Sequence, residues 1–388
     1  MITVNSNDET KPTRINGPIH KPVLKVLGLG GGGGNAVDRM IELGINGVDF
    51  IVANTDHQVL QRSNAPTKIQ LGPKVTRGLG AGGNPSVGKT AAEESWRDIA
   101  AALAGADMVF LTAGMGGGTG TGSIPVATQI AKKCGAVAIA VVTTPFSFEM
   151  GRRLKNSNQG LEELRKHTNT LISIPNDRLL EIAPKNLPLD TAFRLADDVL
   201  RQAVQSITEL ITEPGLINVD FSHIRRLMKL GGGALMTIGQ AKGADKAMEA
   251  VKQALHHPLL DDISINHAAG IIANFTAGSD LTLMEVGNAL NHLQEQANPQ
   301  TEIVMGTTVD DRMGDRIQII LIVTGLGSSP LEEVITGAEQ NINMPHPVMM
   351  PTPSPQQQEP EIRRIPQIAT TNLDLPAFMR RQPRYAGH

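Results

Sequence analysis

The sequence contains little cysteine, no long apolar run and no marked excess of either charge. Its single cysteine, Cys134, cannot form an internal disulfide, which fits a reducing compartment. No uninterrupted apolar stretch approaches the ~20 residues of a membrane span, and residues 1–21 lack the apolar segment of a signal peptide. A net charge of -3 without a basic block argues against nucleic acid and acidic membranes as partners. We therefore expect a cytoplasmic protein that binds no nucleic acid and does not insert into a membrane.

The chain is long enough for two domains and additional segments. Its 388 residues are 40% hydrophobic, which suffices for ordinary cores. Apolar patterning and composition divide it, in order, into a disordered N-terminus (1–22), an α/β domain (23–188), a long central helix (189–212), a smaller α+β domain (213–326), a disordered linker (327–371) and a terminal docking peptide (372–381).

A glycine-rich loop after a buried strand is the most informative stretch. Six glycines occupy nine positions from Gly114 to Gly122, between the apolar run 108–111 and a helical segment. Without Cβ atoms, backbone N–H groups can approach phosphate oxygens, and the helix adds its positive N-terminal dipole. Ser123 is expected to cap this helix, with Pro125 in its first turn. A flexible linker is the alternative, but linkers seldom lie between a strand and a capped helix, so phosphate binding is favoured.

A second glycine-rich run follows the first predicted strand. Gly28, Gly30 and Gly33 match the dinucleotide-binding pattern G-x-G-x-x-G, and a helix is expected from Ala36 to about Leu43. The next strand, 48–53, ends near Asn54 and Asp56, roughly where such folds place a ribose-binding acid. An NAD-dependent enzyme is therefore an open alternative.

A third motif matches the ATPase P-loop pattern. It runs from Gly83 to Thr90 and contains Gly88 and Lys89. However, a P-loop follows a buried strand, whereas this motif follows a glycine-rich stretch, 77–82. An ATPase P-loop is disfavoured, and a helix is expected from about Thr90 to Leu103. A loop that reaches toward a terminal phosphate remains possible.

Alternating strands and helices predict a parallel sheet, whose carboxyl ends share one rim. Two phosphate-type loops on that rim suggest a nucleotide.

Glu149 and Arg153 are four residues apart on a predicted helix, where they can bind ribose or pair with each other. Asn176 follows the predicted strand 170–174 and can bind sugar or base, or cap a helix.

Apolar residues at helical spacing predict one helix from Leu189 to Ile211, roughly 35 Å long. Phe193 and Asp197 are four residues apart in its first half, so the ring can stack on a guanine and the carboxylate can accept its hydrogen bonds. The alternative is that Phe193 packs in the core and Asp197 is solvated.

Near the C-terminal end of the sequence, residues 372–381 follow a proline-rich segment and combine apolar and arginine residues, as docking peptides do.

Four segments stand out together, namely 30–35, 54–56, 116–122 and 218–221. Together they resemble the FtsZ family of tubulin-like GTPases, which act in bacterial cell division. The match runs from about Val23 to Leu326, and the heptapeptide at Gly116 is highly specific to this superfamily. It implies an α/β, tubulin/FtsZ-like fold: a parallel-sheet nucleotide-binding domain joined by a long central helix to a smaller α+β domain, with a disordered C-terminal tail.

The resemblance also implies a GTP/GDP site and the residues that form it. Magnesium would be held mainly by phosphates and water, with no metal ligand from the protein. The implied nucleotide-binding residues are Gly31, Gly32, Gly33, Gly34, Asn35, Asn54, Asp56, Ala81, Gly82, Gly117, Gly118, Thr119 and Gly120 around the phosphates and their loops, Glu149 and Arg153 at the ribose, and Asn176, Phe193 and Asp197 at guanine.

Catalysis is expected to require a neighbouring subunit. Asp220 lies beyond the far end of the helix that carries Asp197, so it cannot act on the nucleotide of its own chain. The resemblance implies that Asp220, with Asn218, orients water on a neighbour's GTP in a head-to-tail filament. His223 stands where the family usually has a second acid.

The resemblance also implies partners: the protein itself, and membrane-tethering and regulatory division proteins that bind the peptide around Phe378, at a mid-cell ring.

Overall fold

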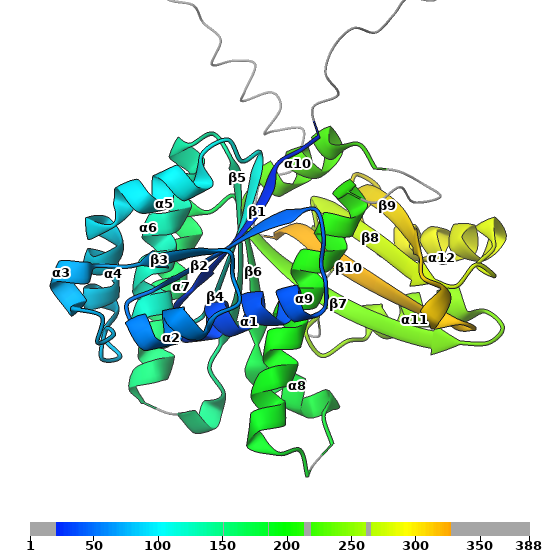
Figure 1. Ribbon diagram of the computed structural model, residues 1–388. Coiled ribbons are helices and arrows are strands. Elements are labelled where there is room, and N and C mark those ends of the chain that lie inside the picture. The colour runs from blue at the N-terminus through cyan, green and yellow to red at the C-terminus, as the bar shows by residue number, and fades with distance from the viewer. Residues whose placement is uncertain (1–20, 150, 185, 213–218, 261–264, 327–388) are drawn as a thin grey trace, which may run out of the picture. The chain divides into compact units, whose positions relative to one another are not determined.

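The computed structural model describes residues 21–149, 151–184, 186–212, 219–260 and 265–326 (Figure 1). Its first part consists of β1 (Leu24–Leu29), α1 (Gly30–Glu42), β2 (Val48–Asn54), α2 (His57–Arg62), β3 (Thr67–Gln70), α3 (Pro73–Thr76), α4 (Pro85–Glu94), α5 (Trp96–Leu103), β4 (Met108–Gly114), α6 (Thr119–Lys133), β5 (Val137–Thr144), η1 (Ser147–Glu149), α7 (Arg152–His167), β6 (Thr170–Pro175) and α8 (Asn176–Ile182).

The second part begins with the long helix and continues into a second set of strands. It consists of α9 (Leu189–Thr212), α10 (Phe221–Lys229), β7 (Gly233–Lys242), α11 (Lys246–Leu255), η2 (Ile265–His267), β8 (Gly270–Ala277), α12 (Leu283–Gln296), β9 (Glu302–Val309), η3 (Asp311–Met313) and β10 (Arg316–Leu326). For this part, the sequence predicts strands at 234–241, 268–276, 302–309 and 316–323 and helices near 245–255 and 282–295, and each is found within about three residues of these bounds.

All the strands lie in one sheet, in the order β3-β2-β1-β4-β5-β6-β7-β10-β8-β9. The strands from β3 to β6 are parallel, which confirms the prediction from the alternating pattern. Beyond them, β10 pairs antiparallel with both β7 and β8, and β9 is parallel to β8. The two parts of the sheet meet at only two residue pairs, Leu171 with Gly233 and Ile172 with Ala234. Backbone pairing therefore contributes little to the union of the two parts.

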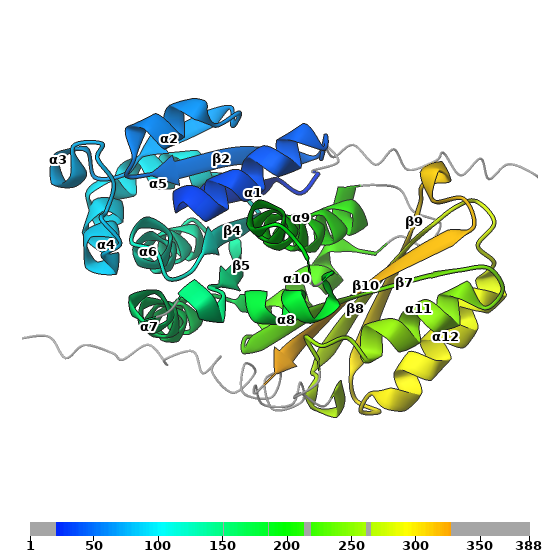
Figure 2. The same cartoon turned by 90° about the horizontal axis from the view of Figure 1, so that it is seen from below.

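Helix α9 joins the two parts through apolar packing. Helices α1 and α9 cover one face of the parallel strands, and α4 to α7 lie on the other (Figure 2). Buried residues of α9 such as Leu200 and Ile207 share one cluster with residues of the parallel strands and with Ile272 and Ile320 of the C-terminal strands. Helices α11 and α12 cover the opposite face of the C-terminal strands. The helix predicted from 189 to 211 is thus confirmed as the shared core element.

Two helices begin earlier than predicted, inside the glycine runs. Helix α1 starts at Gly30 rather than Ala36, and α6 starts at Thr119, so Ser123 is not its cap and Pro125 is not in its first turn. Instead, the Ser123 hydroxyl donates to the Thr119 carbonyl at 2.6 Å. A Cβ on Gly30 would lie 2.8 Å from the Gly120 nitrogen, so the two helix starts pack backbone to backbone. Such packing overrides the low helix propensity of glycine.

The P-loop-like octapeptide is the start of a helix and has no strand before it. Helix α4 begins at Pro85, and the Asn84 side chain accepts from the Ser86 N–H at 3.1 Å. The helix expected from 90 to 103 is in fact two, α4 and α5, divided at Ser95. The Ser95 hydroxyl accepts from the Gly72 N–H at 3.0 Å and donates to the Gln70 carbonyl at 3.1 Å, which fixes the break. The short strand β3, which the sequence analysis missed, supplies that carbonyl.

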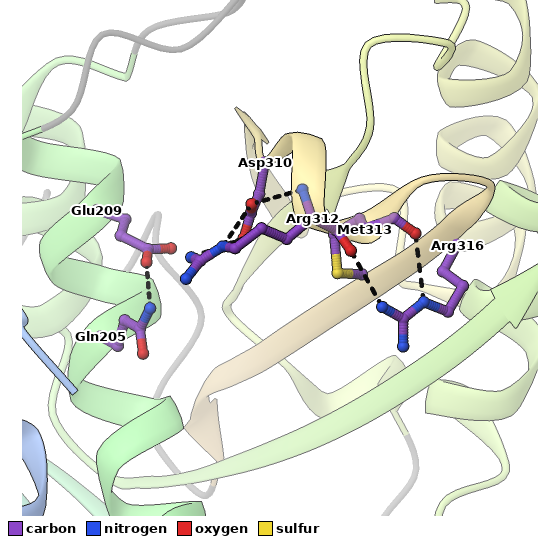
Figure 3. A network of polar contacts seen from close by, with 6 residues as sticks. All are labelled: Gln205, Glu209, Asp310, Arg312, Met313 and Arg316. Atoms are coloured by element: carbon purple, nitrogen blue, oxygen red, sulfur yellow. Dashed lines mark hydrogen bonds and ion pairs between the residues drawn. The ribbon is translucent and has the colours of Figure 1, made fainter.

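A polar cleft of about 510 Å³ separates part of α9 from the C-terminal strands. In Figure 3, Arg312 extends from η3 toward Gln205 and Glu209 of α9. Arg312 donates to the Asp310 carboxylate at 2.9 Å. This hydrogen bond and the charge of Asp310, with a smaller effect of the Glu209 charge, raise the pKa of Arg312. Exposed ion pairs of this kind contribute little to the stability of a fold. The apolar cluster around α9, rather than these charges, therefore holds the C-terminal strands in place.

Among the residues that the structure describes, no helix combines the length and apolar character needed to cross a membrane.

Candidate functional site

Three glycine-rich segments meet beyond the carboxyl ends of β1 and β4, which pair side by side. Close approach is visible at Gly118, where a Cβ would lie 2.7 Å from the Asn84 nitrogen and 2.9 Å from the Ala81 Cβ. By contrast, a Cβ on Gly31, Gly82 or Gly117 would meet nothing within 4 Å. We call this arrangement the glycine cradle. It consists of Gly30 to Gly34 and Asn35 at the start of α1, Ala81 to Asn84 before α4, and Gly114 to Gly120 before and within α6.

Two helix N-termini that lie in the cradle have no side-chain cap. The N-cap residues of α1 and α6, Leu29 and Gly118, make no side-chain capping hydrogen bond. The first N–H groups of a helix have no partner within the helix and carry a partial positive charge. Uncapped starts that border open space are suited to an anion such as phosphate.

Buried polar side chains hold the cradle loops in position. The Asn156 amide donates to the carbonyls of Gly116 at 3.1 Å and Gly83 at 3.2 Å, and so connects two of the three segments. The Thr121 hydroxyl accepts from the Gly116 N–H at 2.8 Å. The hydroxyls of Thr119 and Thr55 are 2.6 Å apart. The sequence analysis missed Asn156, although it lies three residues after Arg153 and therefore on the same side of α7.

Asn54 and Asp56 have partners within their own loop. The Asn54 side-chain oxygen accepts from the Asp56 N–H at 3.1 Å. The Asp56 carboxylate caps α2 by accepting from the N–H groups of Gln58 at 2.9 Å and Val59 at 3.2 Å. In this structure both residues shape the turn after β2, next to Thr55 and its contact with the cradle.

Glu149 and Arg153 form an ion pair, but they do not lie on one helix as predicted. Glu149 ends η1 and Arg153 belongs to α7, and the two elements are separated at Gly151, which has a φ of +61°. The Glu149 side chain is 9% exposed, and its second oxygen accepts from the Phe146 N–H at 3.0 Å. The Arg153 side chain is 58% exposed. The pair therefore offers an accessible guanidinium and a fixed carboxylate close to the cradle residue Gly116.

An aromatic group lies beyond the end of β5. The Phe146 ring is buried, stacks on Phe148 at 5.0 Å and meets Phe193 edge to face at 5.4 Å. Phe193, on α9, remains 39% exposed. A partly exposed ring held by a buried neighbour can stack on a flat ligand.

Two polar side chains near these rings have features of a ligand site. Asn176 follows β6, the strand next to β5, and is 5% exposed, and its side-chain oxygen has no hydrogen-bond partner among the described residues. Buried amide oxygens are rarely left unpaired, so this one indicates a missing donor. Asp197 lies one helical turn after Phe193. Burial raises the pKa of Asp197 to about 7, against a smaller opposing effect of the Arg39 charge. Strong pKa shifts in pockets are typical of functional residues.

In Figure 1, α10 lies at the other end of α9 from α8. Asp220 is the N-cap residue of α10, and His223 lies on its first turn. The Asp220 carboxylate caps α10 by accepting from the Ser222 N–H at 2.8 Å. The hydrogen bonds from Ser222 and, to a smaller extent, the charge of His223 lower the pKa of Asp220. Both side chains are exposed. The structure therefore does not bring Asp220 to the cradle of its own chain. Asn218 lies outside the described residues.

Comparisons with known proteins agree on one family. The GTPase domain model of the Tubulin/FtsZ family matches residues 23–184, and the C-terminal domain model of the FtsZ family matches 232–327. An empty FtsZ dimer of M. jannaschii matches with 46% identity over 79% of this chain and 89% of that one, with a TM-score of 0.76. A GTPγS-bound protofilament of CetZ2 from Haloferax volcanii matches at 17% identity over 83% and 98% of the two chains, with a TM-score of 0.68, which shows a shared fold.

Proposed function

Because this chain belongs to the Tubulin/FtsZ family, we propose that it assembles head to tail into filaments in which each subunit completes the active site of its neighbour. The chain is a GTPase, which binds GTP and hydrolyses it to GDP and phosphate. The observation that carries the proposal is the separation of Asp220 from the glycine cradle by α9. A catalytic residue that faces away from its own nucleotide requires a heterologous contact, and such contacts build open filaments.

The glycine cradle, in this proposal, holds the phosphates of GTP. Its open backbone and two uncapped helix starts support this role. Glu149 and Arg153 bind the ribose. Asn176, Phe193 and Asp197 recognise guanine, which is consistent with the unpartnered Asn176 oxygen. The glycine pattern at 28–33 is then the first GTP loop rather than an NAD site.

Magnesium, in this proposal, accompanies GTP and is coordinated mainly by phosphate and water. The described residues contain no group of three or more His, Cys, Asp or Glu side chains that could hold a metal ion. An open cradle with few acidic side chains fits a cation that arrives with the triphosphate and keeps most of its water, as Mg²⁺ does. When bound, the ion would neutralise part of the negative charge of the triphosphate.

The proposal assigns to Asp220, together with Asn218, the orientation of the attacking water on the GTP of the adjacent subunit. The carboxylate is exposed and its pKa is lowered, so it is charged at neutral pH and available to a partner. His223 lies on the first turn of α10 and takes the place of a second acid. It can accept a hydrogen bond from water when neutral but not when protonated.

Assembly in the presence of GTP tests this function directly. We expect sedimentable polymer and phosphate release with GTP, and little of either with GDP, ATP or NAD. GTP-bound monomers at every protein concentration would instead indicate a regulator that does not polymerise. Saturable NAD binding that is lost on changes at Gly30 to Gly33 would indicate a dehydrogenase.

The cellular role that we propose is a ring at the division site of the cell, tethered to the membrane through the peptide at 372–381. This peptide and Phe378 lie outside the described residues, and the support for the role is the family and the peptide's composition. Removal of residues 372–381 is expected to leave GTP-dependent assembly intact and to abolish mid-cell recruitment, as measured by pelleting and fluorescence microscopy. A truncation that no longer assembles would contradict this division of labour.

A further inference from the structure

The side-chain amide of Asn156 lies between two loops of the glycine cradle. Asn156 belongs to α7 and is 8% exposed. Its NH₂ group donates one hydrogen bond to the Gly83 carbonyl at 3.2 Å and one to the Gly116 carbonyl at 3.1 Å. Both of its donors are therefore used. The two glycines come from segments that are separated in the sequence by α4, α5 and β4, so this one amide connects distant parts of the chain.

The first of these segments, the turn from Ala81 to Asn84, consists largely of glycine. Gly82 and Gly83 have positive φ values of +56° and +69°, and a Cβ on either would meet nothing within 4 Å. The Asn84 N–H closes the turn by donating to the Ala81 carbonyl at 3.0 Å. Glycine loses more conformational freedom on ordering than any other residue. The hydrogen bond from Asn156 offsets this tendency by attaching the turn to a helix.

At the second segment, Asn156 fixes the direction of a backbone donor. The C=O and N–H groups of a trans peptide point in opposite directions. Because the Gly116 carbonyl is turned toward the Asn156 amide, the N–H of Gly117 points away from that amide. Gly117 borders open space, since a Cβ there would meet nothing within 4 Å. The Thr121 hydroxyl accepts from the Gly116 N–H at 2.8 Å and so holds this loop from its other side.

The order of the strands indicates which part of GTP would meet the 81–84 turn. The proposed base pocket is at the ends of β5 and β6, where Phe146 and Asn176 lie, whereas β1 and β2 are on the other side of β4. Gly80, which precedes the turn, donates to the carbonyl of Thr55, directly after β2, at 3.2 Å. The terminal phosphate is the part of GTP farthest from its base. A triphosphate that starts at the base pocket and crosses the cradle therefore ends near this turn.

We propose that Asn156 is the positioning residue through which the site distinguishes GTP from GDP. It joins the 81–84 turn to the 114–118 loop and so keeps both in place around the terminal phosphate. Without this amide, the turn has to be ordered when GTP binds, and the entropy lost at that step lowers the affinity for GTP. GDP has no terminal phosphate to meet the turn, and Thr121 still supports the other loop. This inference rests on the proposed GTP site and adds a residue that does not itself contact the nucleotide.

The test compares the affinities of the full chain for a non-hydrolysable GTP analogue and for GDP, both with Mg²⁺. Competition with a fluorescent nucleotide measures them at protein concentrations too low for sedimentable polymer. Asn156→Leu removes both donors without adding a charge that would repel the phosphates. We expect it to weaken binding of the GTP analogue by on the order of tenfold and binding of GDP by much less. Asn156→Ala should change the ratio of the two affinities in the same direction, and it replaces the leucine variant if that variant does not fold.

Two further variants separate this role from a structural one. Asn156→Gln retains the amide and should keep most of the preference for the GTP analogue. Ser157→Ala is the matched control, because Ser157 is the next residue of α7, is 1% exposed, and its hydroxyl has no hydrogen-bond partner among the described residues. It should leave both affinities unchanged.

Equal losses of affinity for the two nucleotides in Asn156→Leu and Asn156→Ala, or no loss for either, would overturn the inference while the proposed function stands. A wild type that binds neither nucleotide would instead reject the proposed function, and this inference with it.

Discussion

Replacement of Asp220 by alanine is expected to reduce GTP turnover in filaments by about a hundredfold or more while GTP binding stays unchanged. Loss of a group that orients the attacking water and steers its proton commonly has an effect of this size. Binding should persist because Asp220 follows the end of α9, whereas Phe193 and Asp197 lie near its start. Phosphate release per polymerised subunit and nucleotide affinity are the two measurements.

The carboxylate also caps α10, and loss of a cap destabilises a helix. Asp220→Asn is therefore the matched variant, because asparagine is an equally good cap but carries no charge. Both variants should lose turnover, but only alanine should destabilise α10. Full turnover by Asp220→Asn would exclude a role for the charge.

Mixed filaments distinguish action on a neighbour from action within one chain. Subunits with Asp220→Ala, combined with subunits altered at Gly118 so that they bind no GTP, should recover part of the hydrolysis if copolymers form. Each component alone should be inactive. Undiminished turnover by Asp220→Ala alone would eliminate the mechanism.

His223→Asp, which adds a second acid to the loop, should raise GTP turnover without a change in GTP affinity.

Replacement of Asp197 by asparagine is expected to weaken GTP binding by about a hundredfold and to favour xanthosine triphosphate. The asparagine NH₂ group is a donor at the place where a carboxylate oxygen would accept from the guanine amino group. Xanthine has a carbonyl oxygen in place of that amino group, so it can accept from the asparagine. Sites that pair with a buried donor reject a ligand lacking it by large factors, because a polar group is left unpaired. Competition binding with GTP and xanthosine triphosphate measures the switch.

The same substitution should stabilise the nucleotide-free protein at alkaline pH. The pKa of Asp197 is raised from 3.8 to about 7 in the fold, so the native state favours the protonated form. Stability from this group is full below about pH 4 and is lost as the pH rises to about 7, because the unfolded chain ionises first. Asp197→Asn should thus melt higher than the wild type at pH 8, by the equivalent of on the order of 1–2 kcal/mol, and no higher at pH 4. A lower melting temperature at pH 8 with GTP binding intact would contradict both effects.

The elements that could be predicted from sequence are those whose apolar pattern directly reports burial. The long helix from Leu189 and the longer strands of the parallel sheet are of this kind, unlike the four-residue strand β3 at its edge. The starts of α1 and α6 could not be predicted, because they depend on a backbone contact between Gly30 and Gly120 that no local propensity describes. The break at Ser95 depends on two hydrogen bonds to residues about 25 positions earlier.

For the candidate site, the sequence indicated residue types and loops but not what supports them. Glycine loops and the family motifs led to the cradle. Asn156 escaped notice because it acts on distant parts of the chain, the carbonyls of Gly83 and Gly116. Single polar residues on helices are common, and only the fold shows which of them face a pocket.

The length of helix α9 makes the position of Asp220 sensitive to small tilts of the helix. Its 24 residues span about 36 Å from the base pocket toward the loop of Asp220. Over that length, a tilt of less than about 2° displaces the far end by ~1 Å, a misplacement that can cost an enzyme about a hundredfold in rate. The buried apolar side chains of α9, including Leu200 and Ile207, therefore fix the orientation of the helix. Core residues that contact neither the nucleotide nor the neighbouring subunit thereby determine how precisely the loop of Asp220 is positioned.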